Sequence, residues 1–454
     1  MLNSWKSERR SGSLVERGVR DGVDRHIIRL IDRKVLLPVM VPFLFSLIDR
    51  LNISIAALQM NTELSMGAMA FGFVTGVFYV GYALSGLPSN LLAARFGAAR
   101  WMAVIILAWA LVSISMSAVQ TQFQLSILRF ALGVAEGGFV PAMLFWLGKW
   151  YPDGPRARAI SLLVVPVCLA NLFGGPIGGA LMSISPTDGW RMVFLAESLP
   201  ALVVGLVWLR MPEGPEQAVW LHENDKAQLA RVLAAEHEAK GRAGGRSSFL
   251  RAMRDPRLWM YCIMWFLVQC AIYGMAAWLP QILKADFKGR YNDFEISTMT
   301  ALPAIVGLCL ALLMSVTVAR TGDRRFHILG ILLAAALSLM IAMALRDPLI
   351  RAPLLSIAVG IMYPITGAFW SVPLSTLQRD ATAAGLALIS TIGTLGGFVA
   401  PPLMGHFRVT SGAFDLSMWA VVVALLAAAA FPMLGRRSFP RTGANSALDE
   451  APVK

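Results

Sequence analysis

Charged residues are scarce in this chain of 454 residues. They make up 15% of it and hydrophobic residues make up 57%, whereas soluble domains are about 25% charged and about 45–50% apolar. This shortage excludes an ordinary soluble domain. The apolar residues form continuous runs, which favours helices over a barrel of alternating strands. Since a spanning helix needs about 20 mainly apolar residues, about twelve spans fit between residues 35 and 434, and we expect an all-α polytopic membrane protein.

Cysteine and histidine are also rare. The four cysteines show no CxxC spacing, so neither a disulfide framework nor a zinc site is indicated. The five histidines lie in tails, loops or near the ends of spans, which argues against a histidine proton relay. The predicted spans contain no metal-ligand cluster and no nucleophile beside a base. We therefore expect no enzyme activity, no metal site and no bound cofactor.

The basic residues are concentrated in alternate loops. The net charge is +13, and with a cytoplasmic N-terminus short basic loops such as the one with Arg95 and Arg100 face the cytoplasm. The opposite loops at residues 58–67 and 120–124 contain no Lys or Arg. The positive-inside rule then places both termini in the cytoplasm, and the charge indicates topology instead of a nucleic-acid partner. The first 34 residues lack an apolar core, so we expect a cytoplasmic tail and no cleavable signal.

The longest polar interruption divides the spans into two sets of six. We predict a cytoplasmic tail at residues 1–34, an N-terminal six-helix bundle at 35–210, a cytoplasmic linker at 211–258, a C-terminal six-helix bundle at 259–434 and a second cytoplasmic tail at 435–454.

The two sets share an internal repeat. The phrase Ala-Arg-x-Gly-x-x-Arg follows the second span at residues 94–100 and the eighth span at residues 319–325. Glycines and prolines at residues 174–179 of the fifth span are matched at residues 396–402 of the eleventh; they permit close packing and bending. Two such repeats predict a transporter that alternates access to a site between them. The gating candidates are Arg95, Gly97, Arg100, Arg320, Gly322 and Arg324.

Four charged residues interrupt apolar runs of the first half. Asp49 and Arg50 lie in the first span, and Arg129 and Glu136 in the fourth. Each costs about 2.5–3.5 kcal/mol near the bilayer centre, so each must be paired or hydrated. Arg129 and Glu136 are two helical turns apart and share a face, whereas Asp49 and Arg50 point about 100° apart. An organic anion that competes for an arginine would leave a carboxylate to take a proton. The alternative is a static pair of interhelical salt bridges.

The second half offers polar and aromatic side chains instead of charges. Tyr261, Trp265, Gln269 and Tyr273 recur every four residues along the seventh span. Such a stripe is either helix packing or cavity wall, and Gln269 is the strongest candidate because an amide in lipid needs a partner. Glu197, beside Trp190 and Arg191 at the outer end of the sixth span, could be another proton site, but its depth favours an interfacial contact or a pair with Arg191. The substrate-binding candidates are Arg50, Arg129, Tyr79, Gln269, Tyr273, Trp370, Ser390 and Thr394.

Several motifs together carry a family resemblance. They are Asp49-Arg50-x-Asn52, the run from Arg129 to Phe139 with its Glu136-x-Gly138, and Gly189-Trp190-Arg191. Over nearly all of residues 35–434 the chain resembles the anion:cation symporter family of the major facilitator superfamily, most closely its tartrate, phthalate and hydroxyphenylacetate branch. The resemblance implies that Arg50 binds the substrate carboxylate, Asp49 and Glu136 carry protons, and Arg129 couples or gates.

The chain also departs from that family. Leu47 replaces a common tyrosine, and Ser390 and Thr394 replace common asparagines, which thins the donors for a sugar acid and favours an aromatic or compact carboxylate. Ala94 stands where an acidic residue usually precedes Arg95. This puts the usual pairing of the intracellular gate in doubt.

From the sequence we expect a bacterial inner-membrane symporter that uses the proton gradient to import an aromatic acid, dicarboxylate or sugar acid. Its partners would be the organic anion, protons and the lipid bilayer, with no nucleic acid, and it would function as a monomer. An organic-anion uniporter or exchanger without proton coupling is the alternative. A nutrient receptor with the same fold, signalling through its linker, represents a different class.

Overall fold

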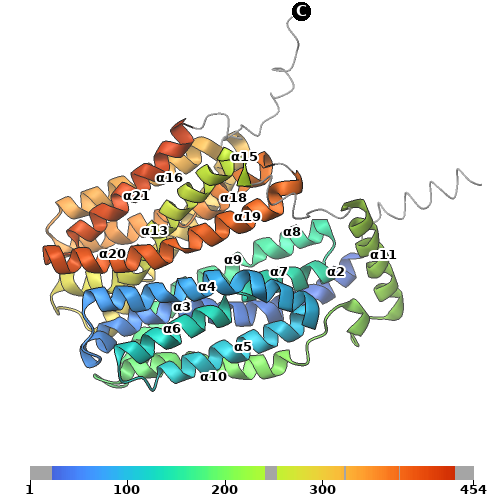
Figure 1. The fold of residues 1–454 in the computed structure, drawn as a ribbon, viewed down its shortest axis with the longest axis horizontal. Helices are drawn as coiled ribbons and strands as arrows, with labels where there is room; N and C mark the ends of the chain where they lie inside the picture. Colours follow the sequence, from blue (N-terminus) through green and yellow to red (C-terminus); the bar gives the residue numbers. More distant parts are fainter. Residues whose placement is uncertain (1–22, 241–252, 322–323, 378, 435–454) are drawn as a thin grey trace, which may run out of the picture.

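The computed structural model describes residues 23–240, 253–321, 324–377 and 379–434, and every secondary-structure element in those ranges is a helix (Figure 1). Gly322 of the gating candidates lies outside the described residues, as does the side chain of Arg320. The predicted tails and linker are described only in part. Their boundaries stay a prediction.

The first half contains six spans, two of which are interrupted. Its helices are α2 (Arg25–Ile31), a π-helix (Asp32–Leu36), α3 (Leu37–Glu63), α4 (Ala68–Phe96), α5 (Ala98–Met116), α6 (Gln122–Glu136), α7 (Phe139–Trp150), α8 (Asp153–Leu162), α9 (Val164–Met182) and α10 (Gly189–Trp208). The linker holds a 3₁₀-helix (Pro215–Gln217) and α11 (Glu223–Lys240).

The second half repeats this order. Its helices are α13 (Pro256–Phe287), α14 (Asp293–Met299), α15 (Leu302–Thr321), α16 (Arg324–Ala344), α17 (Pro348–Met362), α18 (Ile365–Thr376), α19 (Arg379–Thr394), α20 (Gly396–Ser411) and α21 (Asp415–Leu434). The fourth span breaks between α6 and α7, and its counterpart, the tenth, breaks between α17 and α18.

The described residues form twelve candidate membrane spans. Eleven of them are long and apolar enough by length and composition alone. The twelfth is α3, whose 27 residues carry Asp49 and Arg50 in the middle; at about 1.5 Å per residue its length is ample for a bilayer. The predicted fold of two six-helix repeats is confirmed.

The two bundles meet along helices that carry glycine. In Figure 1, α4 of the first bundle runs beside α20 of the second. A Cβ on Gly72 of α4 would lie 2.4 Å from the Pro401 carbonyl oxygen, and one on Gly175 of α9 would lie 2.3 Å from the Ser297 carbonyl oxygen of α14. A Cβ on Gly397 would likewise meet the Tyr79 ring. The repeated glycines thus allow the two bundles to touch, as the sequence predicted.

Polar contacts also cross the interface at the predicted extracellular end. Asn61 Nδ2 donates to Gln281 Oε1 at 3.1 Å, and Lys284 Nζ donates to the Leu58 carbonyl oxygen at 2.9 Å. In this structure the bundles are therefore in contact on the predicted extracellular side.

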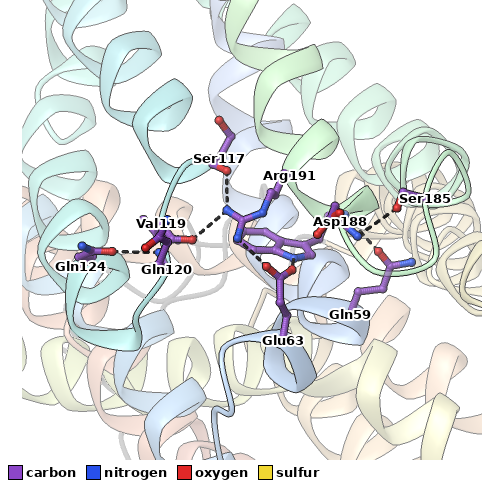
Figure 2. Close-up of polar contacts among 10 residues, drawn as sticks. Gln59, Glu63, Ser117, Val119, Gln120, Gln124, Ser185, Asp188 and Arg191 are labelled. Atoms are coloured by element: carbon purple, nitrogen blue, oxygen red, sulfur yellow. Dashed lines mark hydrogen bonds and ion pairs between the residues drawn. The ribbon is translucent and has the colours of Figure 1, made fainter.

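One arginine joins three helices at the outer end of the first bundle. Arg191 of α10 contacts Glu63 of α3 at 2.6 Å and donates to the carbonyl oxygens of Ser117 and Val119, which follow α5, at 2.7 and 2.8 Å (Figure 2). We call this group the N-terminal outer clamp. It fixes α3, α5 and the start of α10 to one another.

The second bundle has a corresponding arginine. Arg351 of α17 contacts Asp286 of α13 at 3.1 Å and Asp415 of α21 at 2.9 Å. We call this group the C-terminal outer clamp. Each bundle is thus closed at its outer end by a guanidinium that joins separate spans.

Candidate functional site

Arg50 projects from the middle of α3 toward α6. Its Nε donates to Glu136 Oε2 at 2.9 Å, and its guanidinium lies 4.6 Å from the centre of the Tyr82 ring. The side chain is 20% exposed, whereas that of Glu136 is fully buried. Arg50 Nη2 has no acceptor among the described residues. The guanidinium therefore has a free donor in addition to the one that binds Glu136.

Arg129 and Arg50 both lie close to one aromatic ring, that of Phe78. Its guanidinium is 4.7 Å from the centre of the Phe78 ring, which is 5.8 Å from that of Arg50. Arg129 is 1% exposed, and its Nε and Nη1 have no acceptor among the described residues. A buried donor without a partner costs about 1–3 kcal/mol. Two guanidiniums with spare donors form a site suited to a carboxylate, which both can bind by charge-assisted hydrogen bonds.

Asp49 points away from Arg50, into the first bundle. Its Oδ1 accepts from Ser113 Oγ of α5 at 2.6 Å, and it is 4% exposed. Its carboxyl also interacts with Arg129 and Glu136. The expected divergence of the two adjacent side chains is confirmed. Asp49 lies behind the guanidiniums, close to the carboxyl that binds Arg50.

Glu136 is the last residue of α6. The chain turns at Gly137 and Gly138 before α7 begins. Tight packing explains the glycines, since a Cβ on Gly137 would lie 2.4 Å from the Tyr82 carbonyl oxygen. Glu136 Oε1 has no donor among the described residues. This carboxyl therefore sits at a break in the fourth span, bound through one oxygen only.

The second bundle contributes an aromatic and amide surface. The Tyr273 ring of α13 lies 4.4 Å from the Tyr79 ring of α4, centre to centre. Tyr273 interacts electrostatically with Arg50, and Gln269 lies one helical turn before it on α13 and interacts with it. The structure therefore brings the candidates Tyr79, Tyr273 and Gln269 to the interface beside Arg50.

Three other substrate-binding candidates make different contacts. Trp370 packs edge-on against Trp265 and Phe369, with ring centres 5.4 and 5.5 Å apart. The Thr394 hydroxyl donates to the Ser390 carbonyl oxygen of its own helix at 2.9 Å. In the part of the chain that the structure describes, no hydrogen bond or ring contact joins these residues to Arg50 or Arg129.

Two residues of the seventh-span stripe, Tyr261 and Trp265, pack against other helices of the second bundle. The Tyr261 hydroxyl bonds to Thr376 Oγ1 at 2.9 Å, and the Trp265 ring stacks on Phe369 at 4.5 Å. Both residues are buried inside the second bundle. Of the two explanations for the stripe, packing fits Tyr261 and Trp265, and only Gln269 and Tyr273 reach the interface.

The Ala-Arg-x-Gly-x-x-Arg motif at residues 94–100, which leads into α5, binds an acidic residue that the sequence analysis missed. Glu213, beyond α10, accepts from the backbone N–H groups of Arg100 at 2.9 Å and Ala99 at 3.1 Å. Lys149 Nζ is 3.6 Å from the same carboxylate. Gly97 has φ +95°, and a Cβ there would collide with Glu213. A helix N-terminus attracts a carboxylate, but no sequence motif indicates which carboxylate binds here.

The remaining gating candidates have local contacts. The exposed Arg95 guanidinium lies 5.5 Å from the centre of the neighbouring Phe96 ring. Arg324 Nη1 donates to the Ser371 carbonyl oxygen of α18 at 3.2 Å. These contacts stay within one bundle.

The expectation for Glu197 was wrong. Arg191 binds Glu63 of the N-terminal outer clamp instead. Glu197 lies eight residues into α10, about 12 Å from its start, and accepts a hydrogen bond from Asn52 Nδ2 inside the first bundle. It is 7% exposed. The error arose from helix depth: α10 begins at Gly189, so Glu197 lies near mid-membrane and not at the surface.

Among the described residues no group of three His, Cys, Asp or Glu is placed to hold a metal ion.

Comparisons with known proteins agree with this architecture. The model of the Major Facilitator Superfamily matches residues 39–401. A protein of Agrobacterium vitis named "Putative tartrate transporter" is 33% identical over 430 residues, which cover 93% of this chain and 94% of that protein. A quinolone resistance transporter of Acinetobacter baumannii is 30% identical over 407 residues, 89% of this chain and 93% of its own.

A solved structure shares the fold. It is that of a bacterial homolog of the human lysosomal transporter Spinster, inward-facing and unoccupied, with a TM-score of 0.71 at 20% identity over 92% of this chain and 98% of that one. These matches confirm the resemblance predicted from the motifs and are consistent with its anion-transporting branch. The chain therefore belongs to the Major Facilitator Superfamily and is a multi-pass membrane transporter.

Proposed function

We propose that this transporter imports a small organic carboxylate together with protons across the bacterial inner membrane, with both termini in the cytoplasm. The observation that carries the proposal is the pair of arginines with spare donors, Arg50 and Arg129, of which Arg50 is already bound to Glu136. In this arrangement the two arginines can bind an organic anion, and the Glu136 carboxyl group can bind a proton.

Coupling follows from competition for Arg50. A substrate carboxylate that binds the guanidinium through two hydrogen bonds draws it away from Glu136. A buried carboxylate that loses its cation is strongly destabilised unless it takes up a proton. Glu136, and Asp49 beside it, would therefore bind protons as the substrate binds, and release of either ligand would favour release of the other.

The surroundings of the arginines support an aromatic carboxylate. Phe78, Tyr79, Tyr82 and Tyr273 all lie around Arg50 or Arg129. Aromatic rings pack against a planar substrate ring in offset or edge-on geometry. The names of the relatives include tartrate and quinolone, two unlike cargoes, so the proposal of an aromatic acid depends on these rings and not on the relatives.

Uptake into proteoliposomes tests the proposal. We expect an imposed inward proton gradient to drive accumulation of radiolabelled benzoate-like, dicarboxylic or sugar acids, with aromatic acids preferred. The Glu136→Gln variant should lose accumulation and keep counterflow, and Glu216→Gln, an exposed residue of the linker, serves as the matched control. Uptake by the wild type that does not depend on the proton gradient, and that persists in Glu136→Gln, would refute proton coupling.

The second candidate is a uniporter or exchanger. The single Arg50–Glu136 bond would then be a static salt bridge that only holds the arginine in place. Counterflow at wild-type rates in both Asp49→Asn and Glu136→Gln, without proton-driven accumulation in the wild type, favours this alternative.

A further inference from the structure

A third buried carboxyl group lies in the first bundle, in addition to those of Asp49 and Glu136. Glu197 of α10 is 7% exposed and Asn52 of α3 is 0% exposed. Asn52 Nδ2 donates to Glu197 Oε2. The other oxygens of the pair, Glu197 Oε1 and Asn52 Oδ1, are both buried and have no donor among the described residues. Two acceptors without a donor, in one buried pair, need an explanation.

The neighbours of Glu197 offer no positive charge. The charged group that acts on it among the described residues is Asp49, another acid. Of the helices packed against α10, α9 has only Cys168 as a titratable residue, and α5 has only Arg100, at its cytoplasmic end. On α3 the other charged residues are Arg50, bound to Glu136, and Glu63, bound to Arg191. An ionised Glu197 would therefore be buried without a cation, which is strongly unfavourable.

A proton on Glu197 resolves both observations. It removes the buried charge, and it supplies the missing donor: the O–H on Oε1 can donate to Asn52 Oδ1 while Asn52 Nδ2 donates to Oε2. A carboxylic acid and a primary amide then exchange two reciprocal hydrogen bonds, and neither buried oxygen is left unpaired.

We propose that Glu197 is a third proton-binding carboxyl group of this transporter, held as a neutral acid by Asn52 and coupled to Asp49. The coupling has a geometric basis. Asp49 and Asn52 are three residues apart and lie on one face of α3, and the two carboxyls are electrostatic neighbours. Ionisation of one opposes ionisation of the other. The position acts through Asp49, away from the substrate, and this part of the proposal rests on the proton-coupled function proposed above.

The protonation state is tested without transport. We expect infrared spectra of the purified protein at pH 7 to contain the carbonyl band of a protonated carboxylic acid, shifted in D₂O, that disappears in Glu197→Gln. The matched control is Glu63→Gln, where the same change removes an ionised group bound to Arg191; its spectrum should keep the band. A band unchanged by Glu197→Gln would overturn the proposal.

A second variant guards against misfolding. Asn52→Leu preserves side-chain volume and removes the amide. The Glu197 band should persist and move to higher frequency, because its carbonyl has lost a hydrogen bond. If Glu197→Gln does not fold, an Asn52→Leu spectrum identical to the wild type overturns the pairing.

The coupling to Asp49 is tested by the pH profile of uptake. Glu197→Gln keeps a hydrogen-bonding partner for Asn52 but cannot ionise, so we expect an altered pH profile of proton-driven uptake. A profile that superimposes on the wild type, with the infrared band lost, shows a purely structural acid and overturns the coupling. Failure of the proposed transport function gives a different result. The wild type itself then shows no proton-driven uptake, while the infrared band of Glu197 is still present.

Discussion

Replacement of Arg50 by lysine separates the geometry of the arginine from its charge. Arg50 uses Nε to bind Glu136 at 2.9 Å and keeps Nη2 without an acceptor among the described residues. The guanidinium can therefore first receive a substrate carboxylate on this free donor and then bind it through two hydrogen bonds as it leaves Glu136. The ammonium of lysine is a point charge without that fork and cannot bind a carboxylate through two parallel hydrogen bonds. We expect weaker substrate binding in a variant that retains its positive charge.

The magnitude follows from the contacts that lysine loses. A hydrogen bond to a charged group contributes about 1.5–3 kcal/mol, and a guanidinium over an aromatic ring, as Arg50 is at 4.6 Å from the Tyr82 ring centre, about 0.5–1 kcal/mol. The loss of one of each predicts about 2–4 kcal/mol, which corresponds to a rise in Kd of about 30- to 900-fold.

Calorimetry with the purified protein measures this change. The ligand is the carboxylate that most raises the unfolding temperature of the wild type, because a ligand that binds the native state stabilises it by mass action. Arg290→Lys is the matched control, since this exposed arginine also lies near a tyrosine ring, 5.7 Å from that of Tyr291. An Arg50→Lys variant that folds normally and binds within about threefold of the wild type would refute the reasoning.

Three further predictions concern packing, a helix cap and pH. Gly175→Ala places a Cβ 2.3 Å from a carbonyl oxygen of α14, so spin-label distances between the outer ends of the bundles should lengthen, whereas Gly330→Ala, with open space around it, should leave them unchanged. Glu213→Gln should lower stability by about 1 kcal/mol, seen as a lower unfolding temperature, because the N-terminus of α5 loses a negative charge; an unchanged value would contradict the cap. Burial and a hydrogen bond to Asp32 raise the pKa of Tyr151 above its ordinary value of 10.0. The folded state thus holds this proton more tightly, and the stability it adds is present below pH 10 and lost as pH rises further. Tyr151→Phe should reduce that alkaline loss in thermal melts, and an identical pH dependence would exclude the phenol as its source.

Much of the architecture could be predicted because membrane helices are specified locally. A continuous apolar run is enough to identify a span, and an isolated charge such as Arg129 is conspicuous within it. Helical geometry also separated Asp49 from Arg50, since adjacent residues must diverge. These predictions need only the period of the helix and the dielectric of the bilayer.

Contacts between distant helices were less accessible to prediction. Glu213 caps a helix that begins more than a hundred residues earlier, and any loop carboxylate could have served. Glu197 was misplaced because a shift of a few residues in the start of α10 changes its depth by several ångströms. Trp370 fits a cavity wall and a packed core equally well by composition, and only the position of Trp265 and Phe369 decides between them.

The two outer clamps have a mechanical consequence. Within each bundle one arginine ties separate helices through ion pairs, with Glu63 in the first and with Asp286 and Asp415 in the second. Across the bundles at the same end there are two hydrogen bonds, from Lys284 to the Leu58 carbonyl oxygen and from Asn61 to Gln281. Ion pairs therefore join the helices inside each half at this end, whereas hydrogen bonds and glycine packing join the two halves. In the proposed transport cycle, opening of the outer side would first break the contacts between the halves, and each half would rotate as one rigid unit.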